Sequence, residues 1–112
     1  MHTVVETPAY LVDALHLLSR SERDAIVDLL ANDPLCGVVV PATGGVRKLR
    51  VGVEGRGKRG GARVIYLFGG SDVPVFLLAI FAKNEKSDLT GAERNALGKS
   101  VAAMLEDYRR RK

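Results

Sequence analysis

Residues 46–81 read VRKLRVGVEGRGKRGGARVIYLFGGSDVPVFLLAIF, and this stretch determines the fold. Two runs within it, residues 62–68 and 75–81, are rich in β-branched and aromatic side chains, which favour strands. Between them lies Gly69-Gly70-Ser71-Asp72, a composition typical of a hairpin turn. Residues 46–51 interleave apolar and basic side chains, as in a strand with one solvated side. The stretch therefore predicts a three-stranded antiparallel meander.

Two helices are predicted before the meander, after a short strand within residues 1–6. Thr7-Pro8 suits an N-cap followed by a first helical turn, so the first helix is expected over residues 8–19. The second helix is expected to begin after Ser21 as its cap and to stop at Asn32-Asp33-Pro34. Helical spacing predicts that the core-facing side chains of these helices are Leu11, Leu15 and Leu18, then Ile26, Leu29 and Leu30.

A third helix is predicted after the meander. Thr90 and Glu93 have the spacing of a capping box. Apolar residues follow at helical spacing: Leu97, Val101, Met104, Leu105 and Tyr108. The predicted class is α+β, with the N-terminal strand and the meander in a small antiparallel sheet, helices on one sheet face and the other face open to a ligand. A length of 112 residues predicts one domain, 1–112.

Positive charge is concentrated in one part of the chain. The formal net charge is +4, yet residues 43–63 contain seven basic residues and only one acidic residue. The rest of the chain is therefore slightly acidic. A dense basic segment on a nearly neutral body indicates a localised site for a polyanion. Its basic residues are Arg47, Lys48, Arg50, Arg56, Lys58, Arg59 and Arg63.

Other classes of protein fit the sequence poorly. The longest apolar run, residues 73–82, is far shorter than the roughly 20 residues of a membrane span. The single Cys36, expected to be a small apolar residue, and the absence of a leader pattern predict a cytoplasmic protein. His2 and His16 are the only histidines, so we expect no metal site, and His16 is expected to be solvated. Residues 52–61, a glycine-rich loop, lack the spacing of a nucleotide-binding loop, and no cofactor is expected.

The basic residues fall into groups that could bind phosphate in different ways. Alternation along residues 46–51 places Lys48 and Arg50 on one side of the strand and Arg47 on the other. In the loop, Arg56, Lys58 and Arg59 alternate with glycines, so cationic side chains and backbone N–H groups could address one phosphate. The alternative is a solvated strand and loop with no ligand.

Arg63 is predicted to differ from the loop arginines, because a strand would hold its guanidinium rigidly. Lys83-Asn84-Glu85-Lys86 directly follows the third strand, and antiparallel pairing could bring Lys83 near Arg63. Tyr66 alternates with Val64 and Phe68, so core packing is the favoured role for its ring.

Such residues suit chemistry on a phosphodiester. The 2′-hydroxyl of RNA can attack the adjacent phosphorus if one proton is removed, another is donated and the developing charge is neutralised. Lysine or tyrosine can carry protons, and arginine can stabilise charge. No paired carboxylates flank the basic segment in the sequence, so carboxylate-based hydrolysis is not expected.

Three motifs resemble one protein family: residues 44–50 (GGVRKLR), residues 57–66 (GKRGGARVIY) and residues 83–89 (KNEKSDL). In these three motifs the chain resembles the RelE/ParE superfamily of bacterial toxins from toxin-antitoxin systems, and within it the HigB-like branch. The family fold, a small sheet with two N-terminal helices and a C-terminal helix, agrees with the elements predicted above.

The resemblance implies a ribosome-dependent endoribonuclease that cuts messenger RNA in the decoding site by the 2′-hydroxyl route. Arg63, Lys48 and Lys83 match basic positions of the family and are the implied catalytic residues. The implied RNA-binding residues are Arg47, Arg50, Arg56, Lys58, Arg59 and Lys86. Relatives often have tyrosine two residues before the lysine, where this chain has Phe81. The implied partners are a helix-turn-helix antitoxin and the ribosome with bound messenger.

Two other functions stay open at this point. One is a toxin that poisons DNA gyrase, as the ParE branch does, which the phosphate-directed character of residues 47–63 disfavours. The other is a noncatalytic RNA-binding module, which the small number of aromatic residues for base stacking disfavours.

Overall fold

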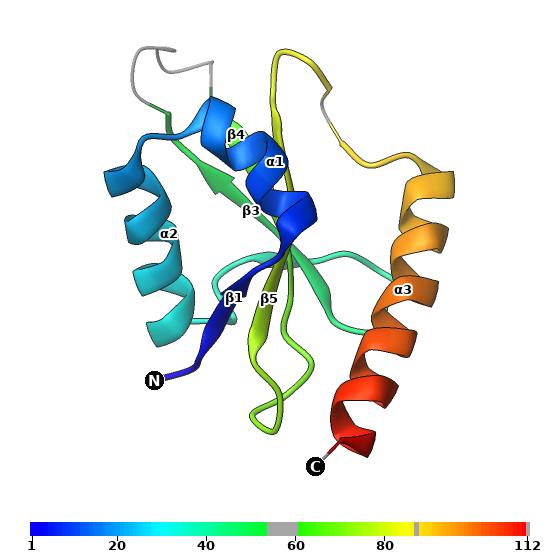
Figure 1. Cartoon of the computed structure of the whole chain (residues 1–112). Coiled ribbons are helices and arrows are strands. Elements are labelled where there is room, and N and C mark those ends of the chain that lie inside the picture. The colour runs from blue at the N-terminus through cyan, green and yellow to red at the C-terminus, as the bar shows by residue number, and fades with distance from the viewer. Residues whose placement is uncertain (54–60, 87, 112) are drawn as a thin grey trace.

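In the computed structural model, which describes residues 1–53, 61–86 and 88–111, a five-stranded mixed sheet is flanked by three helices (Figure 1). The strands lie in the order β1 (Val4–Glu6), β5 (Val75–Ala82), β4 (Ala62–Leu67), β3 (Val46–Val51) and β2 (Val38–Val39). The helices are α1 (Pro8–Leu17), α2 (Arg20–Asn32) and α3 (Gly91–Arg110). The predicted α+β class and the meander of β3, β4 and β5 are confirmed.

The two edges of the sheet add features that the sequence pattern did not predict. β1 runs parallel to β5, with Val4 opposite Val75, so the sheet is mixed and not wholly antiparallel. At the other edge β2 pairs antiparallel with β3, with Val38 opposite Lys48. β2 has only two residues, too few for a recognisable alternation of apolar and polar side chains.

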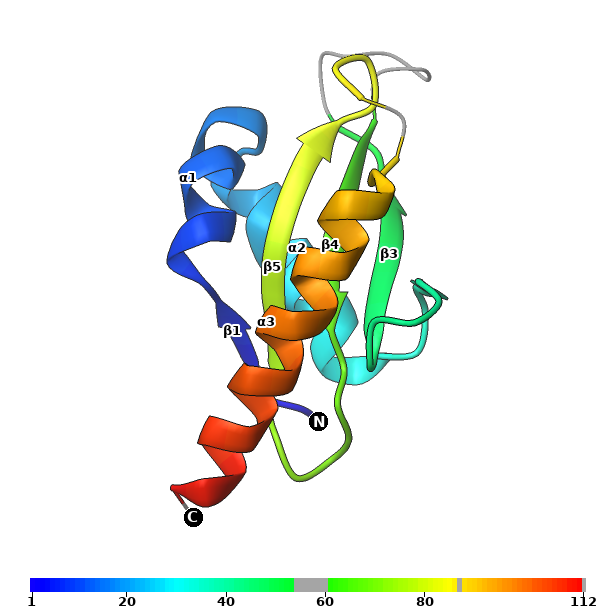
Figure 2. The same cartoon turned by 90° about the vertical axis from the view of Figure 1, so that its right-hand side faces the viewer.

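Helices cover both faces of the sheet, so the prediction that they pack on one face only is wrong. Figures 1 and 2 show α1 and α2 on one side of the sheet and α3 on the other. The reason lies in β4, which is buried along its whole length. Its Val64 and Tyr66 belong to the core under α1 and α2, whereas Ile65 and Leu67 belong to the core under α3. A strand that is apolar on both sides needs cover on both sides.

The starts of the helices follow capping rules. Thr7 caps α1 as predicted, because its side chain accepts a hydrogen bond from the backbone N–H of Tyr10. Ser19, not the predicted Ser21, caps α2, and α1 ends earlier than expected, at Leu17. Ser19 is the N-cap because Glu22 completes a reciprocal capping box with it. At α3 the predicted capping box of Thr90 and Glu93 is confirmed.

The buried side of α1 is rotated from the predicted one. Tyr10, Ala14 and Leu18 are buried at a spacing of four residues, whereas Leu15 is 61% exposed. In α2, Ile26 and Leu30 are buried as predicted, but Leu29 is 42% exposed. The predicted Leu18 is buried and Leu11 packs against the same core, so leucine spacing misplaced only Leu15 and Leu29. In α1 the reason is that Tyr10 and Ala14, which are less obviously apolar, fill the centre of the contact.

α3 packs on the sheet through the predicted stripe. Val101 is buried, and Leu97 and Leu105 pack against the same core beside it. Of the helices in the described part of the chain, none combines the length and hydropathy that a membrane crossing requires.

Candidate functional site

Three basic side chains share the face of the sheet that α3 covers. In β3, Lys48 and Arg50 alternate with Arg47, and Arg50 lies directly opposite Arg63 of β4. Lys48 is opposite Ile65, a member of the core under α3, which identifies this face. Phe81 of β5 is the neighbour of Arg63 on its other side. The pairing of β3 with β4 thus brings Lys48, Arg50 and Arg63 together on this face, and Figure 2 shows α3 lying over these strands.

Lys86 completes what we call the basic cluster, defined as Lys48, Arg50, Arg63 and Lys86. Its ammonium group lies 5.1 Å from the centre of the Phe81 ring, a cation–π contact. Because Phe81 is the cross-strand neighbour of Arg63, this contact places Lys86 on the same side of the sheet as Arg63.

Arg63 is the most unusual member of the basic cluster. It is 7% exposed and is the only charged residue among the buried ones that the structure describes. Its Nη1 donates a long hydrogen bond, 3.4 Å, to the carbonyl oxygen of Ala62. No ion pair joins its guanidinium to a carboxylate of residues 1–53, 61–86 or 88–111, and its cross-strand neighbour Arg50 is a second cation. A buried charge without a countercharge is unfavourable by itself, so this arrangement favours the binding of an anion.

Two acidic side chains reach the basic cluster from the start of α3 and the loop before it. Asp88 Oδ1 lies 3.0 Å from Lys48 Nζ, and Glu93 pairs with Lys86. The expectation that no paired carboxylates flank the basic segment concerned its sequence neighbours, and these two acids come from residues 88 and 93 and each binds a different lysine. Asp88 is 40 positions from Lys48, so only the tertiary fold joins them. Glu93 was recognised as a capping residue, and nothing in its spacing indicated the contact with Lys86.

The Lys48–Asp88 pair gives a testable pH dependence. The hydrogen bond from Lys48, followed by the one from the backbone of Leu89, holds the pKa of Asp88 below its ordinary value of 3.8. A folded-state pKa that is lowered means that the pair stabilises the fold above the unfolded pKa and stops doing so as the pH falls through the folded pKa.

Replacing Lys48 by methionine is therefore expected to raise the pKa of Asp88 toward its ordinary value and to leave it partly lowered by Leu89. A carboxyl-detected NMR titration measures this directly. Lys99→Met, which removes an exposed lysine of α3, is the matched control and should leave Asp88 unchanged. An Asp88 pKa that is the same with and without Lys48 would show that the pair does not form in solution.

Lys83 is brought near Arg63 by the register of β4 and β5, as expected. Its backbone N–H donates to the carbonyl oxygen of Gly61, 3.0 Å away, immediately beyond the end of β5. Gly61 is two residues before Arg63, so the two strand ends coincide. The side chain of Lys83 is exposed. The backbone of Lys83 therefore lies beside the strand end that carries Arg63.

Arg47 lies apart from the basic cluster, on the opposite face of β3. Its Nη1 donates to the carbonyl oxygens of Gly37, 2.8 Å away, and Leu35, 3.2 Å away. These contacts tie the segment after α2 to the sheet. The guanidinium thus has a structural role, and it does not join the other strand bases. The predicted RNA-binding residues Arg56, Lys58 and Arg59 lie outside the described residues.

Tyr66 has the predicted core role. It is fully buried, and its hydroxyl donates to the carbonyl oxygen of Pro34 and accepts from the N–H of Gly37, both at 2.8 Å. Burial raises its pKa to about 12, so the hydroxyl stays protonated at neutral pH and cannot act as a base. Cys36, in the loop that Tyr66 holds, is exposed, which corrects its predicted apolar packing. His16 is exposed, as predicted.

Tyr66→Phe is expected to lower the free energy of unfolding by about 1–3 kcal/mol, because it leaves two buried backbone groups without partners. Tyr10→Phe is the matched control. Tyr10 is also fully buried, but its hydroxyl has no hydrogen-bond partner in the described part of the chain, so its removal should be neutral or stabilising. Urea denaturation of the two variants measures the difference, and equal losses would contradict this role of Tyr66.

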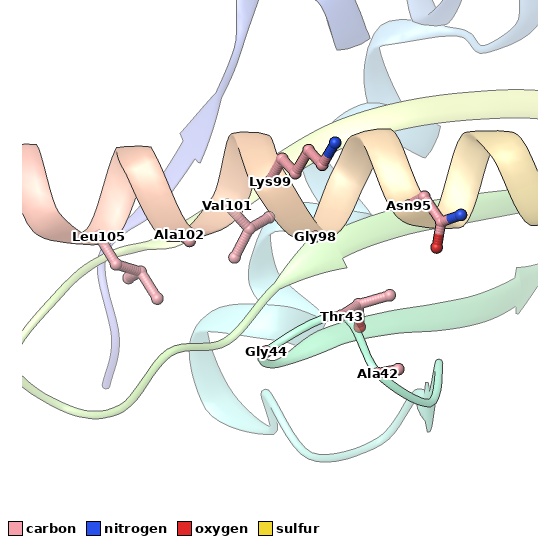
Figure 3. Close-up of a pocket in the computed structure, with 9 residues that line it drawn as sticks. All are labelled: Ala42, Thr43, Gly44, Asn95, Gly98, Lys99, Val101, Ala102 and Leu105. Atoms are coloured by element: carbon pink, nitrogen blue, oxygen red, sulfur yellow. The ribbon is translucent and has the colours of Figure 1, made fainter.

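A separate groove of about 550 Å³ runs between α3 and the loop before β3 (Figure 3). The loop lies close to the helix at Gly98, where an added Cβ would make an ordinary van der Waals contact, 3.4 Å, with the carbonyl oxygen of Ala42. Val101, Ala102 and Leu105 form much of its lining, and none of the basic cluster contributes to it. The basic cluster is thus a surface site distinct from this groove.

Residues 40–112, well over half of the chain, match the family described as the RelE toxin of the RelE / RelB toxin-antitoxin system. The matched part runs from the loop before β3 to the end of the chain. It therefore contains every member of the basic cluster and both carboxylates that contact it.

Proposed function

Because the chain belongs to the RelE toxin family, the toxin half of a toxin-antitoxin pair, we propose that it is a ribosome-dependent endoribonuclease that cuts messenger RNA in the decoding site. RelE family toxins are generally endoribonucleases. The proposal extends this to a substrate held by the ribosome, an action in the cytoplasm and a single toxin domain over residues 1–112.

The observation that carries the proposal is the buried guanidinium of Arg63, which lies opposite Arg50 and has no carboxylate partner within residues 1–53, 61–86 and 88–111. A rigid strand holds Arg63, and a phosphate bound there would supply the missing countercharge. During phosphodiester cleavage the phosphorus gains negative charge, and a preorganised cation at that position lowers the barrier. Arg50, Lys48 and Lys86 supply further cations for the neighbouring phosphates.

In the proposed reaction the 2′-hydroxyl of one nucleotide loses its proton and attacks the adjacent phosphorus. The bond from phosphorus to the 5′-oxygen of the next nucleotide breaks, and that oxygen takes up a proton. The products are a 2′,3′-cyclic phosphate and a 5′-hydroxyl. We assign charge stabilisation to Arg63 and the proton transfers to Lys48 and Lys83 together, because both are lysines at or beside the cluster.

We also propose that the chain belongs to the HigB-like branch and that its antitoxin carries a helix-turn-helix domain. The three motifs at residues 44–50, 57–66 and 83–89 support this assignment by resemblance. The proposed RNA-binding surface includes Arg47, Arg56, Lys58 and Arg59 in addition to the cluster. Arg47 is the weakest of these, because backbone carbonyls already hold its guanidinium.

Expression of the protein without an antitoxin is expected to stop bacterial growth by stopping translation. Purified protein should cut messenger bound to ribosomes and leave the same messenger largely intact in their absence, because the site supplies charge but not the ordering of a flexible strand. Pulse labelling and gel analysis of both RNA samples measure these outcomes. Equal cutting of free messenger would favour an ordinary ribonuclease, and arrest of DNA supercoiling with intact messenger would favour a gyrase poison.

A further inference from the structure

The inference concerns the two carboxylates that contact the basic cluster, and it rests on the proposed function. Asp88 binds Lys48, and Glu93 binds Lys86, so both lysines of the basic cluster already have an anionic partner. The two arginines, Arg50 and Arg63, have no such partner within the residues that the structure describes. Within the described residues, carboxylates therefore neutralise the two lysines of the cluster but not its two arginines.

Both carboxylates are held in place from behind by the backbone. Asp88 Oδ1 accepts a hydrogen bond from the N–H of Leu89 at 2.7 Å, and Glu93 Oε1 accepts from the N–H of Thr90 at 2.8 Å. They therefore do not swing away freely when the lysines are engaged elsewhere. A phosphate that approaches Lys48 or Lys86 meets a fixed negative charge beside the ammonium group.

We infer that Asp88 and Glu93 determine substrate specificity by competing with RNA phosphates for Lys48 and Lys86. Because of this competition, an RNA strand must supply more favourable binding free energy before it can occupy the whole cluster. A free strand must also lose conformational freedom when it binds, whereas a strand held in another particle is already ordered. The carboxylates thereby discriminate against free RNA and favour RNA that is presented in a fixed geometry.

The solvent exposure of these side chains indicates that the ion pairs can open when a phosphate approaches. The side chains of Asp88 and Glu93 are 52% and 42% exposed, and those of Lys48 and Lys86 are 27% and 34% exposed. Ion pairs that are this accessible to solvent contribute little net stability and exchange partners readily. A lysine can therefore leave its carboxylate for an incoming phosphate while the carboxylate stays hydrogen-bonded to the backbone.

The test uses Asp88→Asn and Glu93→Gln, alone and combined. Asparagine and glutamine keep a carbonyl oxygen for the N–H groups of Leu89 and Thr90, so the capping contacts survive while the charge is lost. The probe is a short, fluorescent, single-stranded 2′-O-methyl RNA, which cannot be cleaved by its own 2′-hydroxyl. Affinity is measured by fluorescence anisotropy at low salt.

The double variant is expected to bind this RNA about tenfold more tightly than the native chain, with the gain shrinking as salt is added. Glu106→Gln, which removes one exposed negative charge elsewhere on α3, is the net-charge control for each single variant and should change the affinity by less than about twofold.

Other results would overturn the inference in distinguishable ways. If the carboxylate variants bind as the native chain does, or more weakly, while Lys48→Met and Arg63→Gln lose affinity, the cluster binds RNA but the carboxylates do not compete. If neither the carboxylate variants nor the base variants change the affinity, the cluster does not bind RNA, and the proposed function of this site fails as well.

Discussion

Arg63→Gln is expected to lower the rate of messenger cleavage on the ribosome by about 100-fold or more, the usual effect of removing one preorganised charge-stabilising group. Stability, in contrast to activity, is not expected to fall. Because Arg63 is buried without a carboxylate partner in the described part of the chain, a neutral residue there should leave the free energy of unfolding unchanged or raise it. Growth arrest on expression should disappear together with cleavage.

Two variants make this result specific. Arg63→Lys keeps the charge but loses the planar guanidinium, so it should recover only part of the activity. Arg20→Gln removes an arginine whose side chain is 91% exposed and should leave toxicity intact. Circular dichroism and denaturation show whether each variant is folded. A folded Arg63→Gln protein that is as toxic as the native chain would show that Arg63 is not the catalytic arginine.

Leu30→Ala is expected to lower the free energy of unfolding by about 2–5 kcal/mol, the largest stability effect predicted for this chain. Leu30 is fully buried in the core between α2 and the sheet. Leu15→Ala is the matched control, because it removes the same atoms from a helical leucine that is 61% exposed, and it should change stability by less than about 0.5 kcal/mol. If urea denaturation showed similar losses of stability for Leu30→Ala and Leu15→Ala, the observed exposure of Leu15 on α1 would be contradicted.

The contrast between Leu30 and Leu15 also shows what sequence reasoning could and could not reach. Strand positions were predictable, because Gly69-Gly70-Ser71-Asp72 and the glycine-rich loop mark where the central strands end. Helix faces were less predictable, because Tyr10 and Ala14 compete with leucines for the core, and tertiary packing decides between them.

The candidate site was predictable to a similar degree. The positions of Lys48, Arg50 and Arg63 on strands follow from the sequence, and the tight meander brings them together. The ion pairs of Asp88 and Glu93 were not predictable, because they depend on where α3 docks. The docking was itself misjudged, since a sheet face thought to be open is covered by α3. Arg47 was predicted to face away from Lys48, but its contacts with Leu35 and Gly37 needed the structure.

The most direct test of the proposed function is the chemistry of the cut ends of a defined messenger incubated on purified ribosomes. The native chain should release fragments ending in a 2′,3′-cyclic phosphate and beginning with a 5′-hydroxyl, and Arg63→Gln should release almost none. An intact messenger with the native chain, or equal cleavage by both proteins, would contradict the assignment of this basic cluster as the site of ribosome-dependent RNA cleavage.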